Sequence, residues 1–419
     1  MQQAAARSRT EIQAAKNSVL PLLAASVLTD EQVTIRDVPA ISDVENMLHI
    51  LSELGCGISR TADSVIIDSV NAVSHEIPAR LTKELRSSVF MLGSVLTRFR
   101  RAKISYPGGC DIGLRPIDLH LAGLKRLGVK IEEDKGYITC SCDKLSGADI
   151  LLDFPSVGAT ENIILASAKA EGTTVIRNAA KEPEIVDLAN MLVAMGARVE
   201  GAGTSTIEVE GVPLSSLHPC EHTTVGDRIE AGTFLAGGAL MGGPVTVRGI
   251  DPSFLRMALM KLQAMGCDVQ TGDGWITVAR TGALLPTDIQ TLPHPGFPTD
   301  LQAQFMLLAA RAEGSSVITE NVFENRFMFA AELGRMGADI TIEGHHALVR
   351  GVKGLQGAPV SATDLRAGAA IVLAGISAEG ETRVHHIEHI DRGYEDYVGK
   401  LVSLGADVRR APADVPVSC

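Results

Sequence analysis

Apolar and polar positions along the chain repeat as a unit of about 70 residues. Each copy contains the end of a helix, a glycine and the start of a strand, as in LGCGI at 54, LGVKI at 127, MGARV at 195, MGCDV at 265, MGADI at 336 and LGADV at 404. Glycine suits the position after a helix because the backbone there turns through positive φ. The pattern therefore predicts one supersecondary unit used six times.

A second segment in each unit is apolar on nearly every side. These segments are rich in alanine and glycine and lie at 18–28, 85–96, 161–171, 231–242, 302–313 and 366–378. A helix without a polar face must be buried. Most of the segments lead into strands with alternating valine or isoleucine, such as EQVTIRDV and GPVTVRGI. We therefore expect βα units with helices both inside and outside.

The polar stretch SSLHPCEHTTVGD, at 215–227, has little hydrophobic pattern and divides the six units into three and three. A chain of 419 residues is also too long for one ordinary core. We therefore predict two similar lobes with a cleft between them.

Composition and charge restrict the function classes. A net charge of −12 argues against non-specific binding to nucleic acid, and the absence of an apolar run of about 18 residues argues against a membrane span. Seven cysteines spread over the chain do not form the framework of a secreted disulfide protein. The apolar run VLPLLAASVL resembles a signal peptide, but it is the first of the six buried segments. We expect a cytoplasmic protein.

Two groups of cysteine and histidine invite a metal-site interpretation. They are Cys140 with Cys142, and HPCEH at 218–222. Neither has a second ligand cluster at zinc spacing, so we interpret both as ordinary strand or loop residues and expect no metal.

The starts of the six buried helices carry polar residues at equivalent positions, namely Lys16 with Asn17, Arg86, Glu161 with Asn162, Arg228, Asp300 and Arg366. A helix N-terminus already favours an anion, and a cation placed there costs some tenths of a kcal/mol. Four of the six positions hold cations despite that cost. We therefore predict a convergent anion site; the alternative is that these cations pair with carboxylates across the lobes.

A further set follows the second turn of the units, namely Arg115, Arg177 with Lys181, Arg248, Arg326 and Arg392. For Arg177 and Arg248 a solvated surface ion pair explains the pattern equally well. Asp300, in HPGFPTDLQAQF, is either a carboxylate that stabilises a helix start or a general base among arginines, and periodicity does not choose between the two.

Cys110 lies between glycines in YPGGCDIGLRP, at 106–116. The glycines allow the loop to move. Arg115 would stabilise a thiolate, whereas Asp111 would oppose it. A mobile loop that carries an acid or nucleophile beside an anion site is typical of a lid that closes over a substrate.

Ten blocks of the sequence resemble the signature segments of one enzyme family. They are AKNSVLPLL, LRSSVFMLG, PGGCDIGLRPIDLH, SVGAT, AAKEPEIVD, GDRIEAGTFL, PGFPTDLQAQF, VFENRFM, ATDLRAGAA and HIDRGYE, in that order along the chain. They are similar to those of the UDP-N-acetylglucosamine 1-carboxyvinyltransferases, which are enolpyruvyl transferases. The resemblance covers nearly the whole chain.

The resemblance implies an α/β fold of two inside-out α/β barrel lobes, each of three repeated βα units with buried apolar helices. It also implies that the chain crosses between the lobes near Asn17 and again near Val225. The expected domains are 17–224, a first lobe that carries the mobile Cys110 loop, and 1–16 together with 225–419, a second lobe.

The implied reaction moves the enolpyruvyl group of phosphoenolpyruvate to the 3′-hydroxyl of UDP-N-acetylglucosamine and releases phosphate, as the first committed step of peptidoglycan precursor synthesis. By position, Lys16, Asn17, Arg115 and Arg392 would contact phosphoenolpyruvate. Arg86 would serve the same cluster and the nucleotide sugar. No cofactor is implied. The implied partners are the two substrates, without nucleic acid or membrane, and we expect a monomer.

The remaining roles also follow from the resemblance. The uridine diphosphate would lie along Arg115, Pro116, Ile117, Asp118 and Leu119. Asp300 would accept the hydroxyl proton, and Val322 would touch the nucleotide sugar. Arg326 and Arg366 would stabilise a closed state of the two lobes. Cys110 would be the acid on the lid and the thiol that fosfomycin-type epoxides alkylate.

Three residues depart from the family pattern. Ala14 replaces a frequent glycine, Lys83 stands where arginine is common, and Phe154 stands near a position where some members carry lysine. The last difference puts part of the nucleotide contact in doubt.

Three other functions were weighed against this one. The sister enzyme that acts on shikimate 3-phosphate lacks the lid cysteine and the GLRPIDLH block. A regulatory paralogue that only binds the nucleotide sugar is disfavoured by the intact Lys16, Cys110, Asp300 and Arg392. An enzyme that processes RNA phosphates would need a basic surface.

Overall fold

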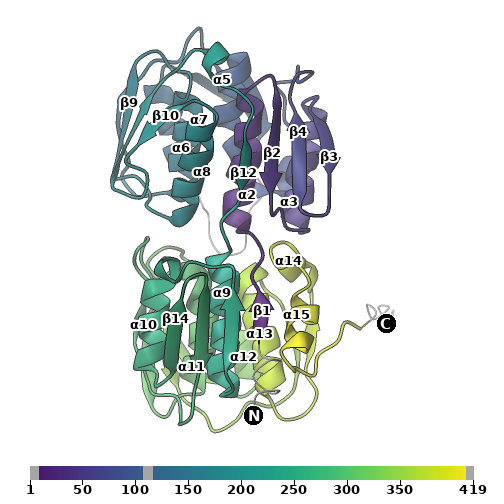
Figure 1. Cartoon of the computed structure of the whole chain (residues 1–419). Coiled ribbons are helices and arrows are strands. Elements are labelled where there is room, and N and C mark those ends of the chain that lie inside the picture. The colour runs from purple at the N-terminus through teal and green to yellow at the C-terminus, as the bar shows by residue number, and fades with distance from the viewer. Residues whose placement is uncertain (1–8, 107–116, 412–419) are drawn as a thin grey trace, which may run out of the picture.

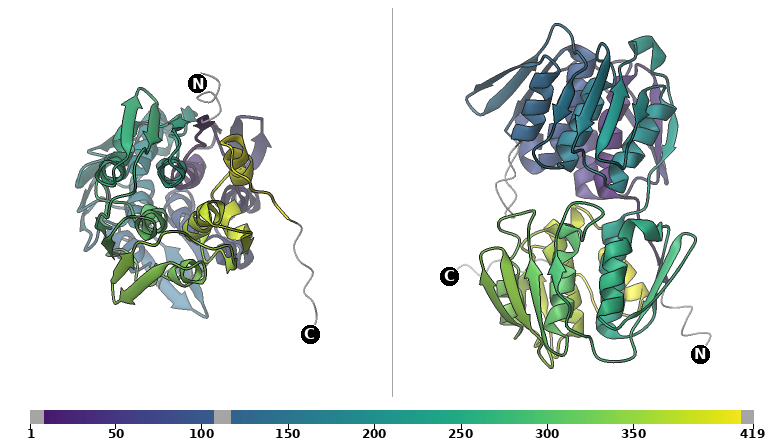
Figure 2. Two further views of the ribbon diagram at one scale, coloured as in Figure 1. Left: turned by 90° about the horizontal axis from the view of Figure 1, so that it is seen from below. Right: turned by 90° about the vertical axis from the view of Figure 1, so that its left-hand side faces the viewer.

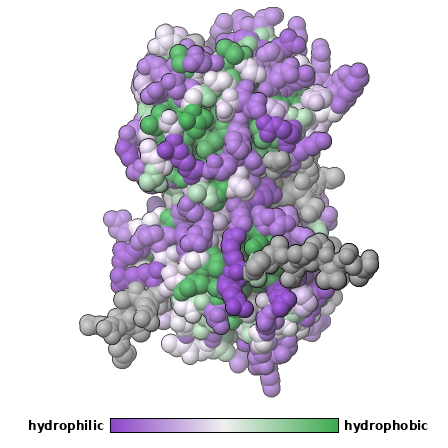
Figure 3. Space-filling model, turned by 90° about the vertical axis from the view of Figure 1, so that its right-hand side faces the viewer, coloured by the Kyte–Doolittle hydropathy of each residue, from purple (hydrophilic) through white to green (hydrophobic). Residues whose placement is uncertain are grey.

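The computed structural model describes residues 9–106 and 117–411, which form two lobes stacked one on the other (Figure 1). Two further views show the same arrangement, with strands toward the outside of each lobe and helices between them (Figure 2). Polar side chains cover most of the face in Figure 3, with small apolar groups on both lobes. Within the described ranges, no helix has the length and apolar character needed to cross a membrane.

The first lobe has three almost fully buried helices, α2 (Lys16–Ala25), α5 (Met91–Phe99) and α7 (Val157–Ser167). The other helices are α3 (Ser42–Glu53), α4 (Ala79–Glu84), α6 (Asp118–Arg126) and α8 (Pro183–Ala194), with the 3₁₀ turns η1 (Ser26–Leu28), η2 (Arg86–Phe90) and η3 (Leu214–Ser216).

Three sheets enclose these helices. In spatial order they are β12 (Glu221–Thr223), β2 (Gln32–Arg36), β4 (Ser64–Asp68) and β3 (Gly57–Arg60); β5 (Arg101–Ser105), β7 (Tyr137–Ser141) and β6 (Lys130–Asp134); and β8 (Asp149–Leu151), β9 (Thr173–Arg177), β11 (Thr206–Glu210) and β10 (Arg198–Glu200).

The second lobe repeats this plan around α9 (Arg228–Met241), α11 (Gln302–Ala310) and α13 (Leu365–Ser377). Its other helices are α10 (Arg256–Ala264), α12 (Ala330–Arg335), α14 (Glu388–Asp391) and α15 (Tyr397–Ser403), with the 3₁₀ turns η4 (Pro252–Leu255) and η5 (Thr299–Leu301). Its sheets are β1 (Arg9–Glu11), β13 (Val245–Arg248), β15 (Trp275–Ala279) and β14 (Asp268–Gly272); β16 (Ile289–Gln290), β17 (Ser315–Thr319), β19 (His346–Arg350) and β18 (Asp339–Glu343); and β20 (Pro359–Ser361) with β21 (Arg383–His385).

The α/β repeat predicted from the hydrophobic pattern is confirmed. The glycine that ends the outer helix of each unit has positive φ in all six copies, at Gly55, Gly128, Gly196, Gly266, Gly337 and Gly405, with φ between 87° and 101°. Residues with a Cβ rarely adopt this conformation, which explains why glycine recurs with the same period.

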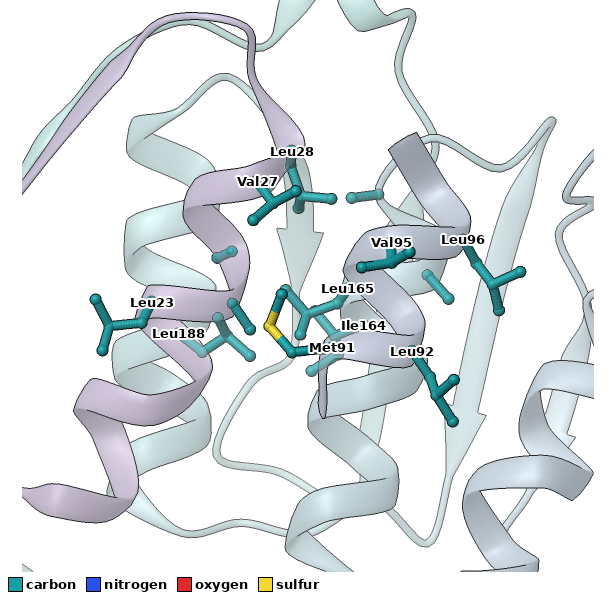
Figure 4. Close-up of a cluster of buried hydrophobic side chains, with 14 of the residues drawn as sticks. Leu23, Val27, Leu28, Met91, Leu92, Val95, Leu96, Ile164, Leu165 and Leu188 are labelled. Carbon is teal, nitrogen blue, oxygen red and sulfur yellow. The ribbon is translucent and has the colours of Figure 1, made fainter. Parts of the chain in front are cut away.

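Each lobe has its own hydrophobic core, because the helices and the inner faces of the strands are both apolar. In the first lobe, Leu23 of α2, Met91 of α5 and Leu165 of α7 belong to one cluster of buried side chains, with Met91 and Leu165 adjacent in its middle (Figure 4). A second, separate cluster gathers around α9, α11 and α13. The two lobes therefore share no core, and polar groups must hold them together.

Two chain segments cross between the lobes. One leads from β1 of the second lobe into α2 of the first, and the other leads from β12 of the first lobe into α9 of the second. The segments pair with each other, since Ala15 N donates to Val225 O at 2.7 Å and Asp227 N donates to Gln13 O at 2.8 Å. This antiparallel contact ties the two connections into one joint.

Gly226 in that joint has no room for a side chain, because a Cβ would stand 2.0 Å from the carbonyl oxygen of Gly249. We predict that Gly226→Ala lowers the free energy of unfolding by about 1–3 kcal/mol, the usual cost of overpacking. Gly243→Ala is the matched control, since nothing lies within 4 Å of its Cβ position. Chemical denaturation of both variants tests this, and equal stability would show that the joint can relax.

Candidate active site

A cavity of about 620 Å³ lies between the lobes, and the N-terminal ends of all six buried helices contribute to its wall. The residues at those ends are Lys16 and Asn17 of α2, Arg86 of η2 before α5, Ser156 and Val157 at the start of α7, Arg228 of α9, Asp300 of η5 before α11, and Arg366 of α13. Helix N-termini carry unpaired N–H groups and a partial positive charge, so the cavity is suited to anions.

The structure brings together eleven of the fourteen site residues that the family resemblance implies. The cavity is lined by Lys16, Asn17, Arg86, Ile117, Asp118, Leu119, Asp300, Val322, Arg326, Arg366 and Arg392. Three others, Cys110, Arg115 and Pro116, lie outside the described residues. The geometry shows that the eleven residues share one cavity, and it does not assign their roles.

Asp43 is a residue of the cavity wall that the sequence analysis missed. It begins α3, is 2% exposed, and binds two of the predicted cations. Lys16 Nζ lies 2.6 Å from its Oδ2, and Arg392 Nε lies 3.0 Å from its Oδ1. In the sequence ISDVENM this aspartate looks like an ordinary first-turn acid, so no local signal pointed to it.

Burial and the neighbouring opposite charge have opposing effects on the pKa values of Asp43 and Lys16. Burial would raise the pKa of Asp43, but the charges of Lys16 and Arg392 hold it below its ordinary value. Burial lowers the pKa of Lys16, and so do Arg392 and Arg366, while Asp43 opposes them. Lys16 is therefore a cation whose charge is less strongly held than that of an exposed lysine.

Asp300 is a second carboxylate with two cationic partners, and its side chain is 25% exposed. Arg326 Nη2 lies 2.8 Å from its Oδ1, and Arg366 Nε lies 3.3 Å from its Oδ2. Burial would raise the pKa of Asp300, but the charges of Arg326 and Arg366 outweigh it and the pKa falls well below its usual range. Asp300 is ionised and held between two guanidinium groups, and its side chain caps no helix.

Ion pairs also join the lobes. Arg228 at the start of α9 donates through Nε to Glu184 Oε1 of the first lobe at 3.0 Å, and both side chains are buried. The pair of Arg392 with Asp43 is a second such contact. The convergence of cations on one cavity and their pairing with carboxylates across the lobes therefore occur together, although the sequence presented the anion site and the pairing as alternatives.

The equivalence of helix starts is imperfect in one unit. Helix α7 begins at Val157, so Glu161 and Asn162 lie a turn inside it rather than at its end. The N-cap of this helix is Ser156, whose hydroxyl accepts a hydrogen bond from Ala159 N. The repeat located the helix correctly but placed its start about one turn too late.

Two of the predicted arginines lie away from the cavity. Arg177 pairs with Asp149 at 2.9 Å, and both side chains are about half exposed. Arg248 is an exposed residue at the end of β13. For both residues the structure shows the surface position.

No group of three or more potential ligand side chains that could hold a metal occurs in 9–106 and 117–411. His222 of the HPCEH segment instead contacts Asp187 at 2.8 Å, and Cys140 and Cys142 are free and buried.

Comparison with known proteins identifies the relatives of this chain. The family model described as EPSP synthase (3-phosphoshikimate 1-carboxyvinyltransferase) matches residues 2–401. A protein of Caldanaerobacter subterraneus subsp. tengcongensis named UDP-N-acetylglucosamine 1-carboxyvinyltransferase 2 is 50% identical over 96% of both chains. The UDP-N-acetylglucosamine 1-carboxyvinyltransferase of a Psychrobacter species is 47% identical over 95% of this chain and 93% of the relative.

Solved structures have the same architecture. The enolpyruvyl transferase NikO from Streptomyces tendae superimposes with a TM-score of 0.86 at 28% identity, over 96% of this chain and 95% of NikO. An EPSP synthase from Acinetobacter baumannii gives a TM-score of 0.72 at 18% identity over 95% of each chain, a likeness of fold alone.

We predict that Asp43→Asn lowers the free energy of unfolding by about 3–5 kcal/mol near pH 7, because it leaves Lys16 and Arg392 without their counter-charge. The folded-state pKa of Asp43 lies below 3.8, so its contribution is present above that pH and is lost as the pH falls through the folded-state value. Denaturation curves from pH 7 to pH 3 should therefore converge for the two proteins. Asp63→Asn, at an exposed pair with Arg36, is the control and should change stability by less than about 0.5 kcal/mol.

Proposed function

Because the chain belongs to the enolpyruvyl transferases of the EPSP synthase family, and within it to the UDP-N-acetylglucosamine 1-carboxyvinyltransferases, we propose the reaction that this name describes. The enolpyruvyl group of phosphoenolpyruvate is transferred to the 3′-hydroxyl of UDP-N-acetylglucosamine, and phosphate is released. The enzyme is then a transferase of peptidoglycan precursor synthesis, a step on which cell-wall formation and cell division depend.

One observation carries this proposal. Six helix N-termini and the cations Lys16, Arg86, Arg228, Arg366 and Arg392 converge on a single cavity. Phosphoenolpyruvate bears a carboxylate and a phosphate, and the acceptor bears a diphosphate. A cavity for both substrates must therefore neutralise several negative charges at once, which helix ends and guanidinium groups do well.

We assign phosphoenolpyruvate to the end of the cavity that holds Lys16, Asn17 and Arg392, together with Arg115. In the structure Asp43 occupies Lys16 and Arg392. An incoming carboxylate or phosphate competes with Asp43 for these cations. Arg86 contacts the same cluster and the nucleotide sugar.

The nucleotide sugar follows Ile117, Asp118 and Leu119 along the wall, continuing from Arg115 and Pro116, and the sugar reaches Val322. The described members of this set line the cavity. The N-terminus of α7, at Ser156–Gly158, lies on the same wall and favours the diphosphate.

Asp300 accepts the proton of the sugar hydroxyl. With Arg326 and Arg366 against it, the carboxylate is ionised but weakly basic. When anionic groups of the substrates bind these arginines, the arginines stabilise the ionised Asp300 less. The pKa of Asp300 then rises and the carboxylate becomes a better base. Substrate binding thus activates the base.

Cys110 donates a proton to the terminal carbon of the enol, and the neighbouring carbon gains oxocarbenium character. The hydroxyl oxygen attacks that carbon, the bond to the phosphate oxygen breaks, and the proton returns from the methyl group. Lys16 and the arginines stabilise the carboxylate and phosphate on either side of the charged centre. Closure of the two lobes brings the Cys110 loop over the substrates.

The closing units are 17–224, and 1–16 with 225–419, which move about the paired crossing segments. We propose a monomer as the active species. The five described cysteines are free thiols, which supports a reducing compartment such as the cytoplasm.

The first test measures phosphate release from phosphoenolpyruvate with UDP-N-acetylglucosamine as acceptor, and with shikimate 3-phosphate in parallel. We expect phosphate release when UDP-N-acetylglucosamine is the acceptor and no release when shikimate 3-phosphate is the acceptor. Asp300→Asn should lower kcat by about 10²–10⁴-fold, because it removes the base. Asp339→Asn is the matched control, since Asp339 forms an exposed pair with Arg350 at 3.1 Å in the same lobe.

If phosphate release depends on shikimate 3-phosphate, that compound is the acceptor instead of UDP-N-acetylglucosamine. If neither acceptor supports release while the protein still binds the nucleotide sugar, a regulatory paralogue becomes the better explanation.

We also predict that an epoxide of the fosfomycin type alkylates Cys110 before any described cysteine. Burial raises the pKa of Cys140 to about 12 and that of Cys220 to about 11, so these remain thiols near neutral pH. Peptide mass spectrometry after limited exposure should find the adduct on Cys110, more quickly when UDP-N-acetylglucosamine is present. First modification of Cys220 would contradict the role given to Cys110.

A further inference from the structure

Glu161 is a buried carboxylate in the wall of the cavity that the reaction above does not use. Its exposed fraction is 0%, and neither carboxylate oxygen has a hydrogen-bond partner in the described part of the chain. A buried carboxylate without a partner is strongly disfavoured in its ionised form. Its position in the second turn of α7, where it faces the cavity between the lobes, therefore requires an explanation.

Two more buried carboxylates lie beside it, at the start of α8. Glu182 is 8% exposed and Glu184 is 3% exposed. Glu184 Oε1 accepts from Arg228 Nε at 3.0 Å, whereas its Oε2 has no partner within the described ranges. Glu182 accepts from two backbone groups, His294 N at 3.3 Å and Lys181 N at 3.0 Å. Glu184 and Glu182 therefore share the charge of the Arg228 guanidinium, and Glu161 adds a third carboxyl group beside them.

The excess of negative charge in this cluster affects the pKa of Glu161 most strongly. Burial, followed by the charges of Glu184 and Glu182, raises the pKa of Glu161 well above its ordinary range. Burial also raises the pKa of Glu182, although Arg228 opposes it. Within the described part of the chain, Glu161 is the one of the three carboxylates that receives no hydrogen bond, and no nearby cation lowers its pKa, so it is the natural holder of a proton.

The other elements around α7 do not change this balance. His120 of α6 contacts Asn162, the residue after Glu161. Burial, Arg228 and Lys181 lower the pKa of His294 to about 4, so this side chain is neutral. Arg86 lines the same cavity but is not among the charges that act on Glu161.

We propose that Glu161 is a neutral carboxylic acid that donates its proton in a hydrogen bond to Oε2 of Glu184, and so holds Glu184 on Arg228 across the lobe interface. These oxygens are without partners among the described residues, so the contact requires the Glu161 side chain to rotate toward Glu184. The proton stays on Glu161, and one hydrogen bond satisfies two of the three unpartnered oxygens. Glu161 is then a positioning residue, because it acts through Glu184 and Arg228.

The contact matters for the proposed reaction because Arg228 begins α9 in the second lobe and its charge acts on Asp300. An ionised Glu161 would repel Glu184 and compete for Arg228. The lobe interface would loosen and the field at Asp300 would change. This consequence rests on the proposed function, whereas the protonation of Glu161 does not.

The test uses the full chain with Glu161→Gln, which keeps a donor but cannot ionise, and with Glu132→Gln as a control that removes an exposed charge from the same lobe. The infrared carbonyl band of protonated carboxylic acids is measured from pH 5 to pH 9. We expect a band near pH 8 in the wild type and in Glu132→Gln that is lost in Glu161→Gln.

Thermal unfolding gives an independent measurement. The unfolded chain releases the Glu161 proton near its ordinary pKa of 4.5, while the folded chain retains it to higher pH. Wild-type stability therefore falls as the pH rises above 4.5, and Glu161→Gln escapes this fall. The Tm of Glu161→Gln should match the wild type near pH 4 and exceed it by about 2 °C or more at pH 8.

The pH dependence of kcat/KM then tests whether Glu161 positions Glu184 and Arg228. The alkaline fall of kcat/KM should move to higher pH in Glu161→Gln and remain unchanged in Glu132→Gln. If Glu161→Gln does not fold, Glu184→Gln is measured in its place. The carbonyl band should then disappear at a lower pH than in the wild type, because the negative charge of Glu184 no longer repels that of an ionised Glu161. An unaltered band, or a Tm difference independent of pH, would overturn the proposal. If the wild type releases no phosphate, the proposed function fails, and the infrared and thermal data still decide the state of Glu161.

Discussion

The direction of the six buried helices is the constraint on which the rest of this molecule depends. Every one begins at the cavity between the lobes, so their partial positive charges point to the same place. The apolar character of the helices buries them, and the strands around them fix their direction. The fold itself, apart from any charged side chain, therefore creates a positive potential in the cavity.

The charged side chains in the cavity are a second contribution to its electrostatics, in addition to the partial charges of the helix N-termini. Cations at helix starts are unfavourable alone, and carboxylates in the cavity wall offset this cost. Asp43 binds Lys16 and Arg392, and Asp300 binds Arg326 and Arg366. These carboxylates occupy the cations that anionic substrates need. In the proposed reaction, substrate binding would exchange one set of ion pairs for another, which would limit the desolvation that each step requires.

The same groups connect chemistry to lobe arrangement. The two hydrophobic cores are separate, so the contact between lobes consists of the paired crossing segments and buried polar pairs such as Arg228 with Glu184. A change of charge at the cavity therefore acts directly on the groups that hold the lobes together. In a lobe interface made mainly of apolar contacts, such a change would have had little effect.

Periodicity alone determined the repeat, the buried helices and the phase of the cations, because burial and the helix-ending glycines leave a regular mark on the sequence. Those marks alone place Lys16, Arg86, Arg228 and Arg366 at one end of their helices. The family resemblance supplied the reaction.

Only the tertiary structure decided which charges meet. Asp43 and Glu184 each lie in the first turn of a helix, where acids are common for local reasons, and nothing nearby in the sequence distinguishes them. Arg177 and Arg326 occupy similar places in the repeat, yet one pairs on the surface and the other is buried against Asp300. An ion pair joins residues that are distant in the chain, and its partners are set by how the lobes pack. For that reason a local pattern predicts the helices of this protein but not its network of charges.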